Sequence, residues 1–175
     1  MKATSAPRAP ARPAEIQPGQ SIELLQHLHI LTRDGRLNQD SRRKLKQVNH
    51  LVQFIETLLR ELPQTPEGPT LADHGAGKSY LGFILYDWCF KALGRGMLWG
   101  IETRADLVER SQQLAQRLGF ERMRFVHMSA AESIVSQALP ERIDLVTALH
   151  ACDTATDDAI GFGLSKQARG MVLVP

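Results

Sequence analysis

The segment 71–80 places a carboxylate two positions before a Gly-x-Gly turn. Asp73 ends an apolar run that is typical of a strand, and Gly75 and Gly77 precede a strongly apolar stretch that is typical of a helix. A strand, a glycine turn and a helix start bring backbone N–H groups against the polar part of a nucleotide-like cofactor. This segment is therefore the first candidate for a binding site.

Three classes of cofactor can be compared with this turn. A phosphate-binding P-loop needs a glycine where the chain has Ala72, although residues 77–79 match its end. A dinucleotide fingerprint needs a third glycine where the chain has Tyr80, and it brings Asp73 close to a doubly charged pyrophosphate. S-adenosylmethionine carries no phosphate, and its ammonium group can pair with Asp73. The residues favour S-adenosylmethionine and leave a P-loop nucleotide hydrolase as an alternative.

A second acid, Glu102, follows the apolar run 98–101. In a β-α-β unit it falls at the tip of the second strand, where its two oxygens can accept both ribose hydroxyls. Met128 and Ser129 follow the third expected strand, where an adenine ring can be sandwiched. The alternatives are a solvated acid at a helix start for Glu102 and a core side chain for Met128.

Apolar runs and helical patterns alternate through the second part of the chain. Strands are expected near 70–73, 97–102, 123–128, 143–149 and 170–174, and helices near 77–93, 104–118, 130–138 and 155–168. This alternation predicts an α/β fold with a doubly wound parallel sheet, right-handed crossovers and helices on both faces. The ligand then binds at the carboxyl ends of the strands.

The chain before this region has a different composition. Residues 1–20 are rich in Pro, Ala and Arg and are expected to be a disordered tail. Residues 21–66 are expected to form a helical appendage, with a short helix, a turn at 34–35 and a long amphipathic helix capped by Asp40 or Ser41. The Pro- and Gly-rich loop 63–69 then marks the start of the cofactor domain, 67–175.

Composition agrees with a globular cytoplasmic enzyme. The hydrophobic fraction is 43% and the formal net charge is +2, too small to imply a charged partner. Cys89 and Cys152 are the only cysteines, which argues against a disulfide framework, a structural metal site or an oxidising compartment. The chain has no apolar run long enough for a membrane helix.

The run 143–158 is an apolar strand pattern that ends in polar residues, among them His150, Cys152 and Asp153. Together with 73–78 it resembles the Rossmann-like methyltransferase family with a Leu-His-Ala-Cys-Asp-x-Ala-Thr-Asp signature, here residues 149–157. That family includes bacterial proteins and eukaryotic proteins named for ribosomal RNA adenine dimethylase or glutathione transferase C-terminal domains. The resemblance begins at about residue 42.

The resemblance implies S-adenosylmethionine binding at Asp73, Gly75, Gly77 and Glu102. It also implies a substrate-facing loop at His150, Cys152 and Asp153. The methyl acceptor is left open, and a module that keeps the cofactor fold without catalysis, binding RNA or protein, is the alternative function.

The chemistry of methyl transfer suggests roles for two of these residues. Aligning the acceptor with the sulfonium methyl supplies most of the catalysis, and a general base is needed only for a weakly nucleophilic acceptor. His150 is the candidate base, oriented by Asp153 or Asp157. Alternatively, Asp153 caps the next helix and His150 bonds the backbone, while Cys152 as a thiol nucleophile is the less favoured alternative.

Two further expectations concern the ends of this region. Basic residues surround the start of the long helix, and contact with RNA through Arg42, Arg43, Lys44 and Lys46 is weighed against a solvated charged face. At the other end, the chain stops at 171–175, inside or just after the fifth expected strand. Because an apolar edge strand would be left uncovered, we expect the sheet to continue in a longer chain.

Overall fold

The computed structural model describes residues 13–149 and 154–174. It divides the chain into two compact units, 1–47 and 48–175. The division falls within the long helix α2 (Gln39–Glu61). The boundary expected from the sequence, after residue 66, lies beyond the end of this helix.

The first unit holds the short helix α1 (Ile22–His27), whose Leu24 and Leu25 are buried. Residues 13–20, part of the segment expected to be a disordered tail, form turns in which Ile16 is buried. The expectation that Asp40 or Ser41 caps α2 is wrong. The helix begins at Gln39, and the side-chain oxygen of Asn38 accepts a hydrogen bond of 2.7 Å from the Ser41 amide.

The second unit is built on a five-stranded parallel sheet with the order β3-β2-β1-β4-β5. The strands are β1 (Thr70–His74), β2 (Met97–Glu102), β3 (Met123–His127), β4 (Leu145–Leu149) and β5 (Gly170–Val174). Chain order reverses direction at β1, which lies between β2 and β4. The carboxyl ends of these three strands therefore form the crevice where ligands bind to open α/β sheets.

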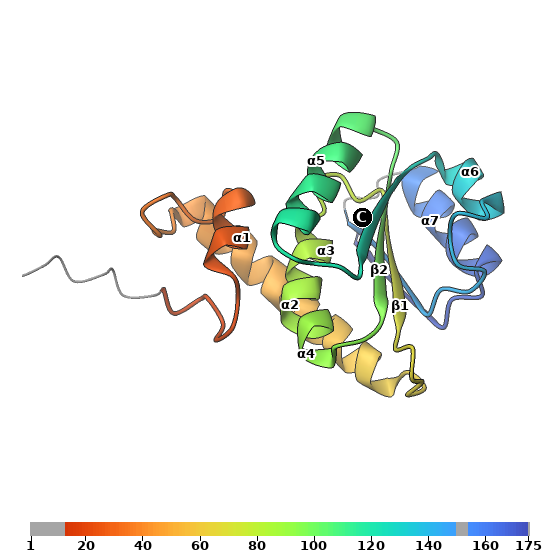
Figure 1. The fold of residues 1–175 in the computed structure, drawn as a ribbon, viewed down its shortest axis with the longest axis horizontal. Coiled ribbons are helices and arrows are strands. Elements are labelled where there is room, and N and C mark those ends of the chain that lie inside the picture. Colours follow the sequence, from red (N-terminus) through yellow and green to blue (C-terminus); the bar gives the residue numbers. More distant parts are fainter. Residues whose placement is uncertain (1–12, 150–153, 175) are drawn as a thin grey trace, which may run out of the picture. The chain divides into compact units, whose positions relative to one another are not determined.

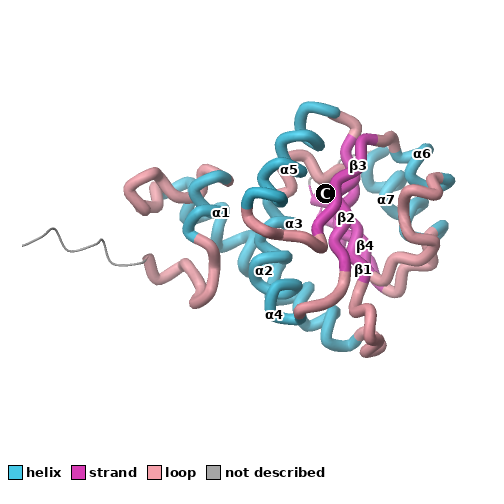
Figure 2. Tube along the Cα trace, viewed as in Figure 1, coloured by secondary structure: helices cyan, strands magenta, loops and turns pink. Residues whose placement is uncertain are grey.

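Helices cover both faces of this sheet, as the alternating pattern predicted (Figure 1). One face carries α3 (Tyr80–Leu85), the π-helical segment η1 (Tyr86–Phe90), α4 (Lys91–Leu93) and α5 (Ala105–Arg117). The other face carries α6 (Ala130–Val135) and α7 (Thr154–Ser165). The strands lie between these two layers in Figure 2, so the Rossmann-like fold is confirmed.

Each face of the sheet has its own packed core. On the α3 and α5 side, the Phe83 and Phe125 rings lie 5.5 Å apart and those of Tyr86 and Phe120 lie 4.5 Å apart. On the α6 and α7 side, Ala72, Val146 and Phe162 belong to one buried cluster. These two cores fix the strands whose ends form the candidate site.

Gly100 in β2 gives a test of the first core. A Cβ atom at this position would lie 2.4 Å from the Phe125 ring, whereas one at Gly161 in α7 would meet nothing within 4 Å. We expect Gly100→Ala to lower the free energy of unfolding by about 1 to 3 kcal/mol through overpacking. Gly161→Ala is the matched control and is expected to be neutral or up to about 1 kcal/mol stabilising. Denaturant unfolding measures both, and equal stabilities would contradict this packing.

Candidate functional site

Asp73 lies at the centre of a buried polar cluster at the carboxyl end of β1. Its side chain is 3% exposed. One carboxyl oxygen accepts a hydrogen bond of 2.9 Å from the Thr147 hydroxyl of β4, and the other accepts one of 3.2 Å from the Ser79 hydroxyl. The cluster joins two strands to the start of α3.

Burial raises the pKa of Asp73 to about 7, against the hydrogen bonds from Thr147 and Ser79, which lower it. The negative charge of Glu102 raises it further. Burial disfavours the charged form of a carboxyl group because it removes water from around the charge. The Asp73 carboxyl group therefore holds its proton more tightly than an exposed one does.

The glycine turn bends over the end of β2. Gly75 and Gly77 have φ values of 66° and 58°, a conformation that glycine adopts without strain. The Ala76 amide donates a hydrogen bond of 2.9 Å to the Ile101 carbonyl. A Cβ atom at Gly75 would meet no atom of the described residues within 4 Å.

The helix after the turn begins later than expected, at Tyr80 rather than near residue 77. Ser79 precedes it with a φ of 51°, and its hydroxyl makes no capping hydrogen bond. That hydroxyl is instead bonded to Asp73. Ser79, at the N-cap position of α3, therefore bonds Asp73 instead of the helix backbone and has a left-handed backbone conformation.

Glu102 lies at the carboxyl end of β2, opposite the turn. Its oxygens accept hydrogen bonds of 2.6 Å from the Gly77 amide and 3.0 Å from the Arg104 amide. The Arg104 guanidinium adds a contact of 3.2 Å to the second of these oxygens. Burial raises the pKa of Glu102, but the hydrogen bonds from Arg104 and Gly77 outweigh it and leave the pKa below its ordinary value.

Met128 and Ser129 follow β3 beside Glu102, as expected. The Met128 amide donates a hydrogen bond of 3.1 Å to the Glu102 carbonyl, and the half-buried Met128 side chain packs against the core on the α6 and α7 side. The Ser129 hydroxyl caps α6 together with Glu132. Its hydroxyl is thus already engaged in a helix cap.

His74, between Asp73 and the turn, is a buried polar residue that the sequence analysis did not single out. Its ring lies 5.2 Å from that of Phe162, and its Nε2 atom has no hydrogen-bond partner among the residues that the structure describes. Burial lowers the pKa of His74, against the charge of Asp158, which raises it. Burial therefore disfavours the charged form of this imidazole.

The other predicted site residues lie outside the part of the chain that the structure describes. His150, Cys152 and Asp153 fall in the segment 150–153, whereas Asp157 lies in the first turn of α7 and is exposed. Within the described residues, no group of three His, Cys, Asp or Glu side chains is placed to hold a metal ion. No helix in the same residues is long and apolar enough to cross a membrane.

Sequence reasoning missed two partners of the predicted acids. Thr147 is a polar residue within an apolar strand, which is a usable signal, but its pairing with Asp73 depends on the β1–β4 register. Arg104 follows Glu102 by two residues, and only the structure folds its guanidinium back onto the carboxylate.

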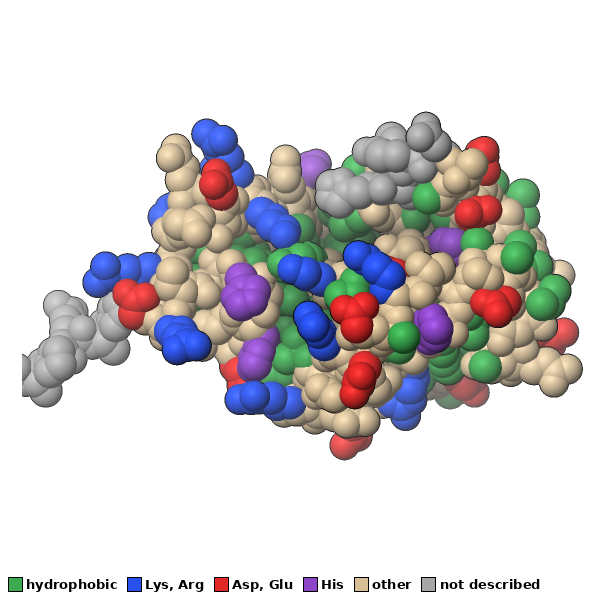
Figure 3. Space-filling view, turned by 90° about the horizontal axis from the view of Figure 1, so that it is seen from above, with side chains coloured by type: hydrophobic (Ala, Val, Ile, Leu, Met, Phe, Trp, Pro, Cys, Tyr) green, Lys and Arg blue, Asp and Glu red, His purple; other side chains and the backbone are tan. Residues whose placement is uncertain are grey.

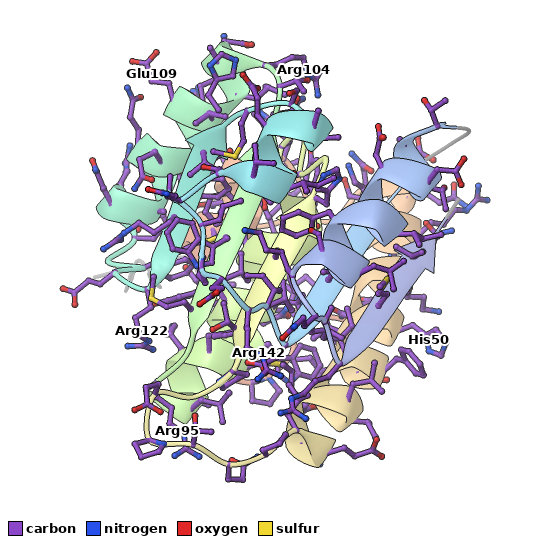
Figure 4. The ribbon with its side chains drawn as sticks, turned by 90° about the vertical axis from the view of Figure 1, so that its right-hand side faces the viewer. His50, Arg95, Arg104, Glu109, Arg122 and Arg142 are labelled. Carbon is purple, nitrogen blue, oxygen red and sulfur yellow. The ribbon has the colours of Figure 1, made fainter. Side chains whose placement is uncertain are left out.

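Charged side chains of both signs gather at the carboxyl edge of the sheet, which Figure 3 views from above. Arg104 lies at this edge in Figure 4, whereas Arg95 lies at the opposite edge. The candidate site thus combines a glycine turn, a buried acid below it and an ionised acid beside it.

A family model described as a methyltransferase domain matches residues 43–175. Comparison with curated protein sequences gave no match.

Solved structures give weaker likenesses. The YcgJ protein from Bacillus subtilis is 19% identical with a TM-score of 0.45, and the match covers 64% of this chain and 43% of that one. An rRNA methylase from Streptococcus thermophilus is 13% identical with a TM-score of 0.49, covering 68% and 63%. TrmK from M. capricolum, solved with S-adenosylhomocysteine, is 13% identical with a TM-score of 0.45, covering 61% and 45%. The chain thus spans less than two thirds of the length of these structures.

The pKa of Asp73 predicts a pH-dependent stability. The folded chain binds this proton more tightly than the unfolded chain, whose carboxyl pKa is 3.8 against about 7 when folded. The stabilising contribution is therefore full below pH 3.8 and is lost as the pH rises through 7. We expect the parent to lose stability relative to Asp73→Asn by up to about 1.4 kcal/mol per pH unit in this window.

Thermal melts from pH 4 to pH 8 measure the effect. Glu121→Gln, which removes an exposed acid, is the control and should follow the parent. A constant difference in stability between the parent and Asp73→Asn across the window would contradict a proton held on Asp73.

Proposed function

The chain belongs to the methyltransferase domain family, the S-adenosylmethionine-dependent methyltransferases, through residues 43–175, and we propose that Glu102 and the glycine turn hold the cofactor. The observation that carries this proposal is the carboxylate of Glu102 facing the Gly77 amide across 2.6 Å at the carboxyl end of β2. A carboxylate and a backbone amide at this edge offer an acceptor and a donor to a sugar and its substituents.

The geometry of the turn fits such a ligand. Among the described residues, no atom lies within 4 Å of the position that a Gly75 Cβ would take, and the nearest atom to such a position on Gly77 is Arg104 Nη2 at 3.7 Å. A polar molecule can therefore come close to the backbone here, as glycines permit. Met128 lies beside the Glu102 backbone, where we propose that it packs on the adenine, with Ser129 next to it.

The sequence predicts that Asp73 pairs with the ammonium group of S-adenosylmethionine. We propose that its main role is structural. Its two oxygens are bonded to Thr147 and Ser79, and it is buried. Asp73 therefore acts on the cofactor mainly by fixing the glycine turn relative to β4. Its partial charge near neutral pH still favours a cation above it.

When bound, S-adenosylmethionine supplies an electrophilic methyl group on sulfonium. The residues of this chain hold and orient it, and alignment with the acceptor provides most of the rate enhancement. We propose that the whole protein transfers this methyl group to an acceptor not yet identified, with His150 as general base and Asp153 as its orienting partner. We also propose a cytoplasmic location.

Contact with RNA is a finer proposal for the first unit. We propose that the basic residues near the start of α2 contact phosphates: Arg43, Lys44 and Lys46, together with Arg42, which is also paired with Glu15. This proposal rests on the basic cluster and on the nature of phosphate binding, which is electrostatic.

Glu102→Gln tests the cofactor site. The substitution removes the charge and turns an amide group toward the Gly77 and Arg104 donors, so we expect binding of S-adenosylhomocysteine to weaken by about 1.5 to 3 kcal/mol. Calorimetry measures this, with Glu109→Gln on the surface of α5 as the matched control.

Equal affinity of Glu102→Gln and the parent would contradict the proposed site. Transfer of a labelled methyl group from S-adenosylmethionine to cell extract then separates an enzyme from a binding module. If the parent binds the cofactor but transfers no labelled methyl group, the alternative of a non-catalytic binding module would be supported.

Replacing Arg43, Lys44 and Lys46 with Gln tests the RNA proposal. We expect weaker RNA binding and a salt slope lower by roughly 0.7 per lost contact with single strands. Replacing Arg110 and Arg117 of α5 with Gln is the control. An unchanged slope in the triple variant, or a parent that binds no RNA at low salt, would contradict the proposal.

A further inference from the structure

Both oxygens of Glu102 are occupied by groups of the protein itself. One accepts the Gly77 amide, and the other accepts the Arg104 amide, the Arg104 guanidinium and the Thr103 hydroxyl, at 2.6 to 3.2 Å. The Glu102 side chain is only 7% exposed as a result. A ribose that bonds both oxygens of this carboxylate must therefore displace a donor from the oxygen that accepts three.

Arg104 is the donor that can leave most easily. Its side chain is 62% exposed, and its Nη2 atom lies 3.7 Å from the position of a Cβ on Gly77. The guanidinium thus contacts the carboxylate and lies beside the turn at Gly77. Withdrawing it breaks only side-chain contacts, because the Arg104 amide keeps its own bond to Glu102.

The backbone around Arg104 is held in place independently of its side chain. The His127 ring lies 2.9 Å from the Thr103 carbonyl through Nε2, and α5 begins directly after Arg104. The guanidinium can therefore move while the loop stays where it is. Opening the site would therefore need a change of the Arg104 side chain alone and no rearrangement of the loop.

We propose that Arg104 sets the affinity of this chain for its cofactor by competing with the ribose hydroxyls for Glu102. In the free chain its guanidinium closes the site, and on binding it swings into solvent. The inference rests on the proposed cofactor site. It leads to an unusual expectation, because removing a charged residue from a binding site should then tighten binding.

The size of the effect follows from the nature of the contact. An ion pair with one exposed partner contributes modestly, so we expect Arg104→Ala and Arg104→Gln to bind S-adenosylhomocysteine about two- to fivefold more tightly than the parent. S-adenosylhomocysteine is the probe because it lacks the sulfonium charge, which an arginine would repel over a distance. Arg104→Gln removes the charge but keeps much of the length of the side chain. Comparing it with Arg104→Ala therefore distinguishes the effect of charge on affinity from the effect of side-chain size.

Arg169→Ala is the matched control. Arg169 is also a partly exposed arginine in an ion pair, 3.6 Å from Asp144, but it lies before β5, at the amino end of the sheet. The Arg169→Ala variant should bind S-adenosylhomocysteine with the same affinity as the parent. Isothermal calorimetry gives the affinities, and thermal melts check that each variant is folded.

A second measurement follows Arg104 itself. In NMR spectra of the free chain, the Arg104 Nε–H should be protected from exchange by its bond to Glu102, and S-adenosylhomocysteine should remove this protection. Unchanged or weaker binding by both Arg104 variants, or protection that persists in the complex, would overturn the inference and make Arg104 a support of Glu102. A parent that does not bind at all would instead overturn the proposed cofactor site, and this inference with it.

Discussion

The buried carboxyl group of Asp73 is the interaction on which the candidate site depends. It bonds the Thr147 hydroxyl on β4 and the Ser79 hydroxyl at the start of α3, and so ties together the three elements that meet at the point where strand order reverses. The space around it is filled closely. A Cβ atom at Gly82 would lie 2.4 Å from the Ser79 hydroxyl and 3.3 Å from Asp73, which explains a glycine inside an otherwise apolar helix.

The surroundings of the two acids of the site shift their pKa values in opposite directions. Asp73 has neutral hydroxyl partners, and burial raises its pKa to about 7. Glu102 has an arginine and two backbone amides, so its pKa is lowered despite burial. Asp73 is therefore bonded to β4 and to the start of α3, whereas Glu102 is bonded to the turn and to Arg104. Both side chains carry a carboxyl group, so the difference in their pKa shifts comes from the groups that surround each of them.

The order and type of elements in the second unit were predictable because each strand and helix carries its own local signal. The apolar runs at 97–102 and 170–174 match β2 and β5 in full. The errors lie where side chains compete for the same partner. Asn38 takes the capping role expected of Asp40 or Ser41, and the bond from Ser79 to Asp73 delays the start of α3.

The sequence by itself determined the strand, glycine turn and helix, the acid at the end of the next strand, and the parallel sheet that brings them to one edge. These follow from periodicity and from the conformational freedom of glycine, both of which are local properties. Only the tertiary structure decided that Thr147 meets Asp73 from 74 residues away, and that Arg104 folds back on Glu102. Such pairs depend on strand register and side-chain rotamers, which are fixed by packing across the whole sheet and leave no periodic trace along the chain.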